Sequence, residues 1–267
     1  CALVGRGHER IVAELSSFQL EHARKLRANV AVLLNLAPDH LDRHGSLSGY
    51  GAAKARLAEL QRAEDALVVN RDDAWARGVG DRSPARVFGF STERRLESGA
   101  YKDGADLVLA PQGPVELRIP ISALSAASRR PVANALAAAL AARLAGATTE
   151  AISRTLARCA GLPHRVRDVC VRAGVRYVDD SKATNPAAAI ASLLAQETPI
   201  VWLAGGRNKG LAFDELAVAA RGASVRRAVV YGESSAELER ALAGACPIER
   251  VANLAEAVAT AAACARP

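Results

Sequence analysis

Polar residues that could do chemistry stand where short aliphatic runs of this sequence end. Glu14 lies near the end of the run 11–15, and His40 follows the run 30–36. Because the carboxyl ends of parallel strands face a common ligand crevice, both side chains could reach a Mg²⁺ ion or a substrate carboxylate. Each also has an ordinary explanation, Glu14 as a charge at a capped helix start and His40 as a surface side chain. Lys54, in a helix of small residues, is by itself a solvated lysine.

The densest polar cluster of the chain is the segment 179–186, with the sequence DDSKATNP. It follows an aliphatic run and precedes a helix that its last two residues, Asn and Pro, would cap and open. A helix start offers free N–H groups and a positive potential to an anion. Capping accounts for the Asn-Pro pair alone, which leaves Asp180, Lys182 and Thr184 as candidate ligand contacts.

Two further segments favour an anionic ligand. Gly205-Gly206 follows the aliphatic run 200–204, and paired glycines let the backbone approach a ligand closely while Lys209 supplies positive charge. Arg165 lies beside Gly161-Leu162-Pro163, at a predicted joint between two domains. An arginine there either fixes the interdomain turn or binds a phosphate in the cleft, and both interpretations stay open.

Short aliphatic runs alternate with helical stretches, which predicts an α/β fold with a mostly parallel sheet. The continuous runs AVLLNL and PIVWLAGG are typical of strands buried on both faces. A β-rich excursion is expected at 91–122 and a hairpin turn at Ala173-Gly174. The predicted strands are 11–15, 30–36, 66–70, 87–90, 166–172, 175–179, 200–204, 228–231 and 250–252. The predicted helices are 17–27, 47–62, 132–145, 149–159, 185–195, 214–220, 234–243 and 254–264.

The composition is that of a packed globular protein, since 50% of the 267 residues are hydrophobic and 24% are charged. No apolar run has the length that a bilayer requires, so we expect no membrane association. The 35 Lys and Arg residues exceed the 28 Asp and Glu residues, for a net charge of +7. Because these basic residues are scattered, we expect no nucleic-acid partner and favour a phosphorylated or carboxylated small molecule. The five cysteines, without C-x-x-C spacing, indicate reduced thiols, and the absence of Met predicts a fragment cut at both ends.

Seven motifs occur in an order that resembles the Mur ligase family. They are ELSSFQLE at 14–21, NLAPDHLDR at 35–43, GYGAAKARL at 49–57, NALAAAL at 134–140, GLPHR at 161–165, DDSKATNP at 179–186 and LAGGRNKG at 203–210. The resemblance extends from about residue 11 to the C-terminus. Lys182 followed by Thr184 is similar to the branch of the family that adds D-glutamate, and no DNPR motif for diaminopimelate or lysine is present.

The resemblance implies a central ATP-binding domain with a mostly parallel sheet at 1–160 and a Rossmann-like, amino-acid-binding α/β domain at 161–267. It implies an ATP-dependent amide-forming ligase that adds D-glutamate to UDP-N-acetylmuramoyl-L-alanine in cytoplasmic peptidoglycan precursor synthesis. In this chemistry ATP phosphorylates the substrate carboxylate, the incoming amine attacks the acyl phosphate, and a tetrahedral intermediate loses phosphate. We expect a monomer. The alternatives are a sister ligase or a folylpolyglutamate-synthase-like ligase for another amino acid, and a non-catalytic protein that binds a nucleotide or a UDP-sugar. A third alternative is a dinucleotide-dependent oxidoreductase, and the absence of a G-x-G-x-x-G motif counts against it.

Residue roles also follow from the resemblance, which implies His40 and Lys54 as catalytic residues and Glu14, His40 and Lys54 as metal ligands. Glu14 and His40 are similar to ligands or neighbours of a Mg²⁺ ion, and Lys54 to the family lysine that CO₂ carbamylates. A carbamate is carboxylate-like and can help to hold a metal, whereas an ammonium would repel it. The ATP contacts implied are Asn134, Arg165, Asp180 and Lys182. The D-glutamate contacts implied are Thr184 and Lys209.

The chain departs from the family pattern in four places. Under the resemblance we expect this fragment to lack the family's N-terminal domain, which holds the UDP group, and the C-terminal serine and aromatic residue that complete the D-glutamate pocket, which would lie beyond Pro267. No G-x-x-x-x-G-K-[ST] loop, which cradles ATP phosphates, occurs in the sequence. In the family this loop precedes ELSSFQLE, so truncation ahead of Cys1 would remove it, and we expect this chain alone to be inactive. Arg130-Pro131 stands where the family usually has His-Asn, which puts the nucleotide contact near Asn134 in question.

Overall fold

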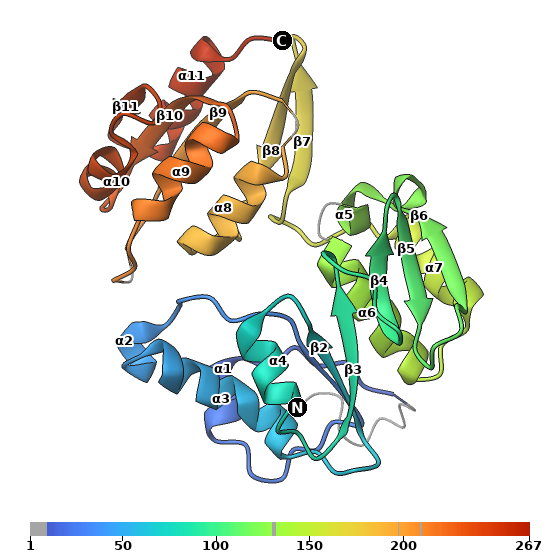
Figure 1. Ribbon diagram of the computed structural model, residues 1–267. Helices are drawn as coiled ribbons and strands as arrows, with labels where there is room; N and C mark the ends of the chain where they lie inside the picture. The colour runs from blue at the N-terminus through green and yellow to red at the C-terminus, as the bar shows by residue number, and fades with distance from the viewer. Residues whose placement is uncertain (1–9, 130–131, 197, 209) are drawn as a thin grey trace.

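The computed structural model describes residues 10–129, 132–196, 198–208 and 210–267. These residues form a six-stranded sheet, a two-stranded hairpin and a three-stranded sheet (Figure 1). The strands of each sheet follow one another along the chain, with no strand of another sheet between them. We call the part built on the larger sheet the six-stranded unit, and the hairpin with the smaller sheet the three-stranded unit. Within the described ranges, no helix is both long and apolar enough to cross a membrane.

The strands of the six-stranded unit lie in the order in which they follow along the chain, with β1 at one edge. The first four pair in parallel and the last two antiparallel. The strands are β1 (Val30–Leu33), β2 (Ala66–Asn70), β3 (Arg86–Ser91), β4 (Gly99–Asp103), β5 (Asp106–Ala110) and β6 (Leu117–Pro120). In β2, Leu67, Val68 and Val69 are all fully buried, as expected of a strand covered on both faces.

Helices cover both faces of this sheet. The helices are α1 (Ser17–Glu21), α2 (Leu41–His44), α3 (Leu47–Glu59), α4 (Ala74–Gly80), α5 (Ala126–Arg129), α6 (Val132–Leu144) and α7 (Thr149–Arg158), with the 3₁₀ turn η1 (Ile121–Ala123). Leu136 and Leu140 of α6 pack with Val68 on one face, in a core that α7 also joins. Ala58 of α3 and Val79 of α4 pack with Leu67 and Val69 on the other face. The result is a three-layer α/β/α arrangement.

The three-stranded unit begins with the antiparallel hairpin β7 (Arg167–Arg172) and β8 (Val175–Asp179). A parallel sheet in the order β11-β10-β9 follows, and helices again cover both of its faces. Its strands are β9 (Ile200–Gly205), β10 (Val225–Tyr231) and β11 (Ile248–Arg250), and its helices are α8 (Pro186–Leu194), α9 (Asp214–Gly222), α10 (Ser235–Leu242) and α11 (Leu254–Cys264). In parallel sheets of this kind the carboxyl ends of the strands form the ligand crevice.

The predicted fold class is confirmed. The predicted segments 66–70, 175–179 and 254–264 coincide with β2, β8 and α11. The excursion expected at 91–122 contains β4, β5 and β6, and the hairpin turn falls at Ala173-Gly174 between β7 and β8.

Several predicted elements are wrong or too long. The strand expected at 30–36 ends at Leu33, and the helix expected at 47–62 ends at Glu59. Residues 11–15 form no strand, because no strand of the described chain pairs with them, and Val12 is 98% exposed. The helix expected at 17–27 ends at Glu21, since Arg56 of α3 donates hydrogen bonds to the Leu20 and Ala23 carbonyls there. The strand expected at 250–252 is instead β11, which ends at Arg250.

Candidate functional site

The loop after β1 holds His40 in a strained backbone conformation. His40 has φ 53° and ψ 30°, the left-handed region that few non-glycine residues adopt, and its N–H donates to Asp39 Oδ1 at 2.9 Å. Its ring packs edge-on against Phe18 of α1, with ring centres 4.9 Å apart. The local Asp39 hydrogen bond and this ring contact together fix the imidazole at the carboxyl end of β1.

Four rings from three segments pack together beside His40, and we call Phe18, His40, His44 and Tyr50 the ring cluster. His44 stacks on Phe18 at 5.7 Å and lies 5.4 Å from Tyr50 between ring centres. Its Nε2 is 3.0 Å from Ser17 Oγ, which belongs to a buried residue. The ring cluster thus joins the ELSSFQLE motif, the NLAPDHLDR motif and helix α3.

Lys54 reaches the same cluster through Tyr50. The two residues are four positions apart on α3 and therefore share a face of the helix. Lys54 Nζ lies 4.9 Å from the centre of the Tyr50 ring, a favourable cation–π distance, and the ring of Tyr50 lies 6.1 Å from that of His40. The structure therefore places two predicted catalytic residues, His40 and Lys54, on one aromatic side chain.

Glu14 is not drawn into this cluster. It is exposed in the segment ahead of α1, and no hydrogen bond or ion pair joins it to His40 or Lys54 in the described chain. Mg²⁺ prefers oxygen ligands in octahedral geometry. Among the residues that the structure describes, no group of three or more His, Cys, Asp and Glu side chains could hold a metal ion. These side chains do not fit a complete Mg²⁺ site, and no reaction step below goes through a metal.

One hydrogen bond connects the His40 loop with the DDSKATNP motif. Asn185 Oδ1 accepts from Ala188 N at 2.8 Å and so caps α8, as predicted, with Pro186 at the first helical position. The other side-chain atom, Nδ2, donates to Asp39 Oδ2 at 3.0 Å. Asp39 thereby contacts His40 in the six-stranded unit and Asn185 in the three-stranded unit.

The GLPHR and DDSKATNP motifs are also tied together. His164 Nδ1 lies 2.7 Å from Asp179 Oδ2, and Asp180 Oδ1 accepts from Val166 N at 2.9 Å. Lys182 N donates to the His164 carbonyl at 3.0 Å. These contacts hold Arg165 beside the start of the loop that leads to α8.

Several predicted contacts are open to solvent. Arg165, Lys182 and Asn134 are exposed, the first two around the DDSKATNP loop and the third near the start of α6. Asp180 and Thr184 lie in the same loop, between β8 and α8, and Asp180 is half-buried. Lys209 and the Arg130-Pro131 pair lie outside the described residues. Arg165 and Lys182 are available to an anionic ligand beside the DDSKATNP loop.

The glycine loop after β9 is held by its own asparagine and by α10. Asn208 Oδ1 accepts from Leu211 N at 2.9 Å, and its Nδ2 donates to Glu237 Oε2 at 2.6 Å. Gly206 has φ +110°, which side chains rarely tolerate. The Gly206 carbonyl accepts from Ser234 N at 2.9 Å, which ties this loop to the start of α10, and the approach of its backbone to a ligand stays a prediction.

Family models match both units. Residues 2–142 match the Mur ligase middle domain, and residues 164–267 match the Mur ligase glutamate ligase domain. The chain belongs to the Mur ligase family. This membership confirms the resemblance seen in the seven motifs.

Curated relatives within the Mur ligase family are similar over most of the chain. The UDP-N-acetylmuramoylalanine--D-glutamate ligase of Desulfitobacterium hafniense (strain DSM 10664 / DCB-2) is 41% identical over 259 residues, covering 96% of this chain and 57% of that protein. The ligase of the same name from Myxococcus xanthus (strain DK1622) is 38% identical over 259 residues, covering 95% of this chain and 56% of that protein. The chain thus spans a little more than half the length of these relatives.

Solved structures of Mur ligases share the fold. MurF ligase from Thermotoga maritima in complex with ADP has a TM-score of 0.67 at 18% identity and covers 89% of this chain and 56% of that one. MurF from Acinetobacter baumannii has a TM-score of 0.64 at 22% identity, covering 87% and 52%. Identities this low establish the fold of the chain and leave its chemistry to its own residues.

Sequence reasoning missed part of this site. Phe18, His44 and Tyr50 were not singled out, although Tyr50 and Lys54 have the four-residue spacing that brings side chains together on a helix. That spacing was the available signal for the ring cluster. The contact of Asn185 with Asp39 joins residues 146 positions apart and had no local signal.

Asp179 should make the junction sensitive to acid. The N–H of Ser181, and next the His164 ring, lower the pKa of Asp179 from its ordinary value to about 2. A lowered pKa means that the folded state favours the carboxylate, so this stabilisation is complete above about pH 4 and is lost as the pH falls toward 2. We expect Asp179→Asn to flatten the decline of thermal stability between these pH values, as measured by circular dichroism. An unchanged acid limb in the variant would contradict this role.

Proposed function

We propose that this chain forms the ATP-facing and amino-acid-binding parts of a ligase that adds D-glutamate to UDP-N-acetylmuramoyl-L-alanine. The observation that carries the proposal is the 41% identity to a D-glutamate ligase over 96% of this chain. The Lys-x-Thr pattern of DSKATN, at Lys182 and Thr184, agrees with that branch. We also propose the domain division at 1–160 and 161–267.

The proposed reaction has two steps. A carboxylate oxygen of UDP-N-acetylmuramoyl-L-alanine takes the γ-phosphoryl group of ATP, which forms an acyl phosphate and releases ADP. The amine of D-glutamate then attacks the acyl carbon, and the tetrahedral intermediate expels phosphate while the new amide nitrogen loses a proton. Both steps gather anions in one place, so positive side chains and hydrogen-bond donors are needed around them.

The residues of this chain divide between the two steps. We infer that Arg165, Lys182, Asp180 and Asn134 contact ATP, because the first three lie where the two units meet. We place Thr184 and Lys209 on D-glutamate. His40, fixed by Asp39 and Phe18, would contact the substrate carboxylate that accepts the phosphoryl group.

Lys54 would act as a carbamate. A carbamate forms when the neutral amine adds to CO₂ and loses a proton, which converts a cation into an anion. Lys54 is half-buried next to Tyr50, which gives its side chain a defined position near His40. Mg²⁺ dependence and carbamylation stay predictions, and ¹³C NMR of protein equilibrated with ¹³C-bicarbonate would test the second directly.

The setting of the reaction is also part of the proposal. ATP and a UDP-linked sugar are its substrates, which places it in the cytoplasm, and we propose a monomer that binds neither nucleic acid nor membrane. Light scattering of the purified protein would give the mass of one chain if the monomer is right.

The test is phosphate release by the product of the complete reading frame that encodes these residues. We expect release with ATP, Mg²⁺ and UDP-N-acetylmuramoyl-L-alanine to depend on D-glutamate and to fall at least about tenfold in Thr184→Val, which removes a hydroxyl at nearly constant side-chain volume. Release that depends instead on L-lysine or diaminopimelate would identify a sister ligase. Absence of release with every amino acid, from a folded protein, would favour a binding protein.

A further inference from the structure

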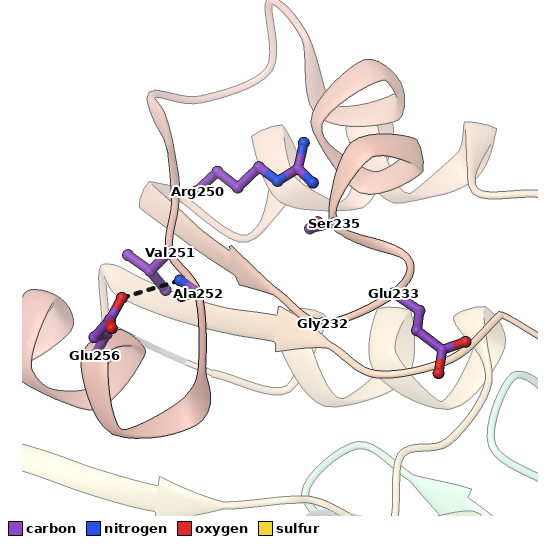
Figure 2. A pocket seen from close by; sticks show the side chains of 7 residues that line it. All are labelled: Gly232, Glu233, Ser235, Arg250, Val251, Ala252 and Glu256. Atoms are coloured by element: carbon purple, nitrogen blue, oxygen red, sulfur yellow. Dashed lines mark hydrogen bonds between the residues drawn. The ribbon is translucent and has the colours of Figure 1, made fainter.

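A pocket opens at the carboxyl ends of β10 and β11, beside the glycine loop that follows β9. It has a volume of about 710 Å³ and lies between Gly232, Glu233 and Ser235 on one side and the segment 250–252 with Glu256 on the other (Figure 2). In parallel α/β sheets this edge is where ligands bind. The side chains within the pocket identify the chemistry it would accept.

Ser235 brings a hydroxyl to the pocket that has no hydrogen-bond partner in the described ranges. Ser235 is only 2% exposed, and it is one of the residues that line the pocket. A polar group in so enclosed a position gains from a hydrogen-bond partner, because it has given up its hydrogen bonds to water. A ligand that accepts a hydrogen bond in the pocket would supply that partner.

Helix α10, of which Ser235 is the first residue, lacks a side-chain cap. The residue in the capping position, Ser234, uses both its N–H and its Oγ on the Gly206 carbonyl, at 2.9 and 2.8 Å. Its side chain does not accept from the first N–H groups of the helix. The positive end of α10 is therefore left to solvent or to an anion at the pocket wall.

Arg250 supplies a full positive charge to the same pocket. No side-chain ion pair or hydrogen bond of Arg250 occurs within the part of the chain that the structure describes. In Figure 2 its guanidinium extends to the side of the pocket where Ser235 lies. Guanidinium groups bind carboxylate and phosphate oxygens through paired hydrogen bonds.

Neither of the two carboxylates that line the pocket forms an ion pair with Arg250 in the described chain. Glu256 accepts from Ala252 N at 3.0 Å and from Asn253 Nδ2 at 2.9 Å, which holds it at the start of α11. Glu233 lies 3.9 Å from Arg207 in an exposed ion pair. Figure 2 shows these two acids at opposite ends of the pocket, with Arg250 and Ser235 between them.

We propose that this pocket binds an oxyanion, the carboxylate or phosphate group of a small molecule. Arg250 pairs with the anion, Ser235 Oγ donates to it, and the N–H groups of Ala236 and Glu237 in the first turn of α10 complete the contacts, since Ser235 N donates to the Gly232 carbonyl at 3.2 Å. The proposal goes beyond the ligase function, because none of these residues is assigned to ATP or to D-glutamate.

Amide chemical shifts of the ¹⁵N-labelled chain provide the test, with inorganic phosphate and acetate titrated separately at constant ionic strength. We expect saturable shifts centred on Gly232, Ser235 and Ala236 with at least one of the two probes. Saturation by phosphate alone indicates a phosphorylated ligand, and saturation by acetate alone indicates a carboxylate. The proposal is overturned if neither probe gives saturable shifts at these residues.

Matched variants separate a built site from general charge attraction. We expect Arg250→Gln to weaken binding about tenfold or more, because a charge-assisted contact is lost. Ser235→Ala should weaken it about threefold while leaving the melting temperature unchanged, since the hydroxyl makes no hydrogen bond in the described chain. Arg226→Gln, on exposed Arg226 in β10, removes the same charge and should change affinity less than about twofold. Equal losses of anion affinity in the two arginine variants would contradict the proposal. The ligase function is tested separately, by phosphate release, so the two proposals can fail independently.

Discussion

Lys54→Ala should lower D-glutamate-dependent phosphate release by about 100-fold or more, the range seen when one preorganised charged group is removed from a reaction centre. The lysine shares Tyr50 with His40, so the deletion removes a charged group from the ring cluster at the carboxyl end of β1. Its contribution to folding is small, because a cation–π contact open to solvent is worth about 0.5–1 kcal/mol. We therefore expect the variant to remain folded, with a melting temperature within a few degrees of the parent.

Lys54→Arg distinguishes the two chemical forms of this residue. A guanidinium keeps the positive charge and the contact with Tyr50, but it does not form a carbamate under the assay conditions. If the carbamate is the working form, Arg should be as inactive as Ala, and added acetate should restore part of the activity of the Ala variant. Substantial activity in Lys54→Arg would show that a cation is sufficient. Lys102→Ala, on an exposed lysine of β4, is the control and should leave the rate unchanged.

Elements whose signals are local could be predicted from the sequence. The run 66–70 predicts β2 because three successive residues, Leu67–Val69, are buried on both faces of the sheet. The start of α8 was predictable because the Asn185 cap requires only the N–H of Ala188, three residues away. The same locality explains why the loops with His40, Asp180 and Gly206 were found separately, since each of these three follows an aliphatic run.

Features that depend on distant partners could not be predicted in this way. Residues 11–15 have a strand-like pattern, but a strand exists only where another strand pairs with it. Helix α1 is short because Arg56, more than thirty residues later, binds the carbonyls at its end. Helix α4 has a local cap, because Ala76 N donates to Asp73 Oδ1 at 2.7 Å. It was not predicted because the helix is short and contains two glycines, which are poor helix formers.

The candidate site follows the same division. Aliphatic runs predicted where His40, Asp180 and Gly206 would lie, but no period in the sequence indicates that Phe18 and Tyr50 pack against the His40 ring. The left-handed backbone of His40 is likewise set by its surroundings rather than by its residue type. Which loops meet across the two units therefore came from the structure alone.

The hydrogen bond between Asp39 and Asn185 should be lost in the single variant Asn185→Asp and regained when the two residues are exchanged. Asn185→Asp keeps the helix cap, because a carboxylate oxygen can accept from Ala188 N, but it sets two carboxylates at the 3.0 Å contact that Asn185 Nδ2 now makes. Like charges held together across an interface cost several kcal/mol. Movement of the two loops relieves part of this penalty. We therefore expect D-glutamate-dependent phosphate release to fall at least about tenfold.

The double variant Asp39→Asn with Asn185→Asp reverses donor and acceptor and restores the bond. The new amide at position 39 would donate to the new carboxylate at position 185, whose other oxygen still caps α8. We therefore expect activity within about threefold of the parent and a strongly non-additive cycle. Asn185→Ser is the matched control, since serine also caps helices but lacks the amide donor, and it should lose less activity than Asn185→Asp. If the double variant is no better than Asn185→Asp, the hydrogen bond does not set the arrangement of the two units, and the activity loss reflects only the negative charge added at position 185.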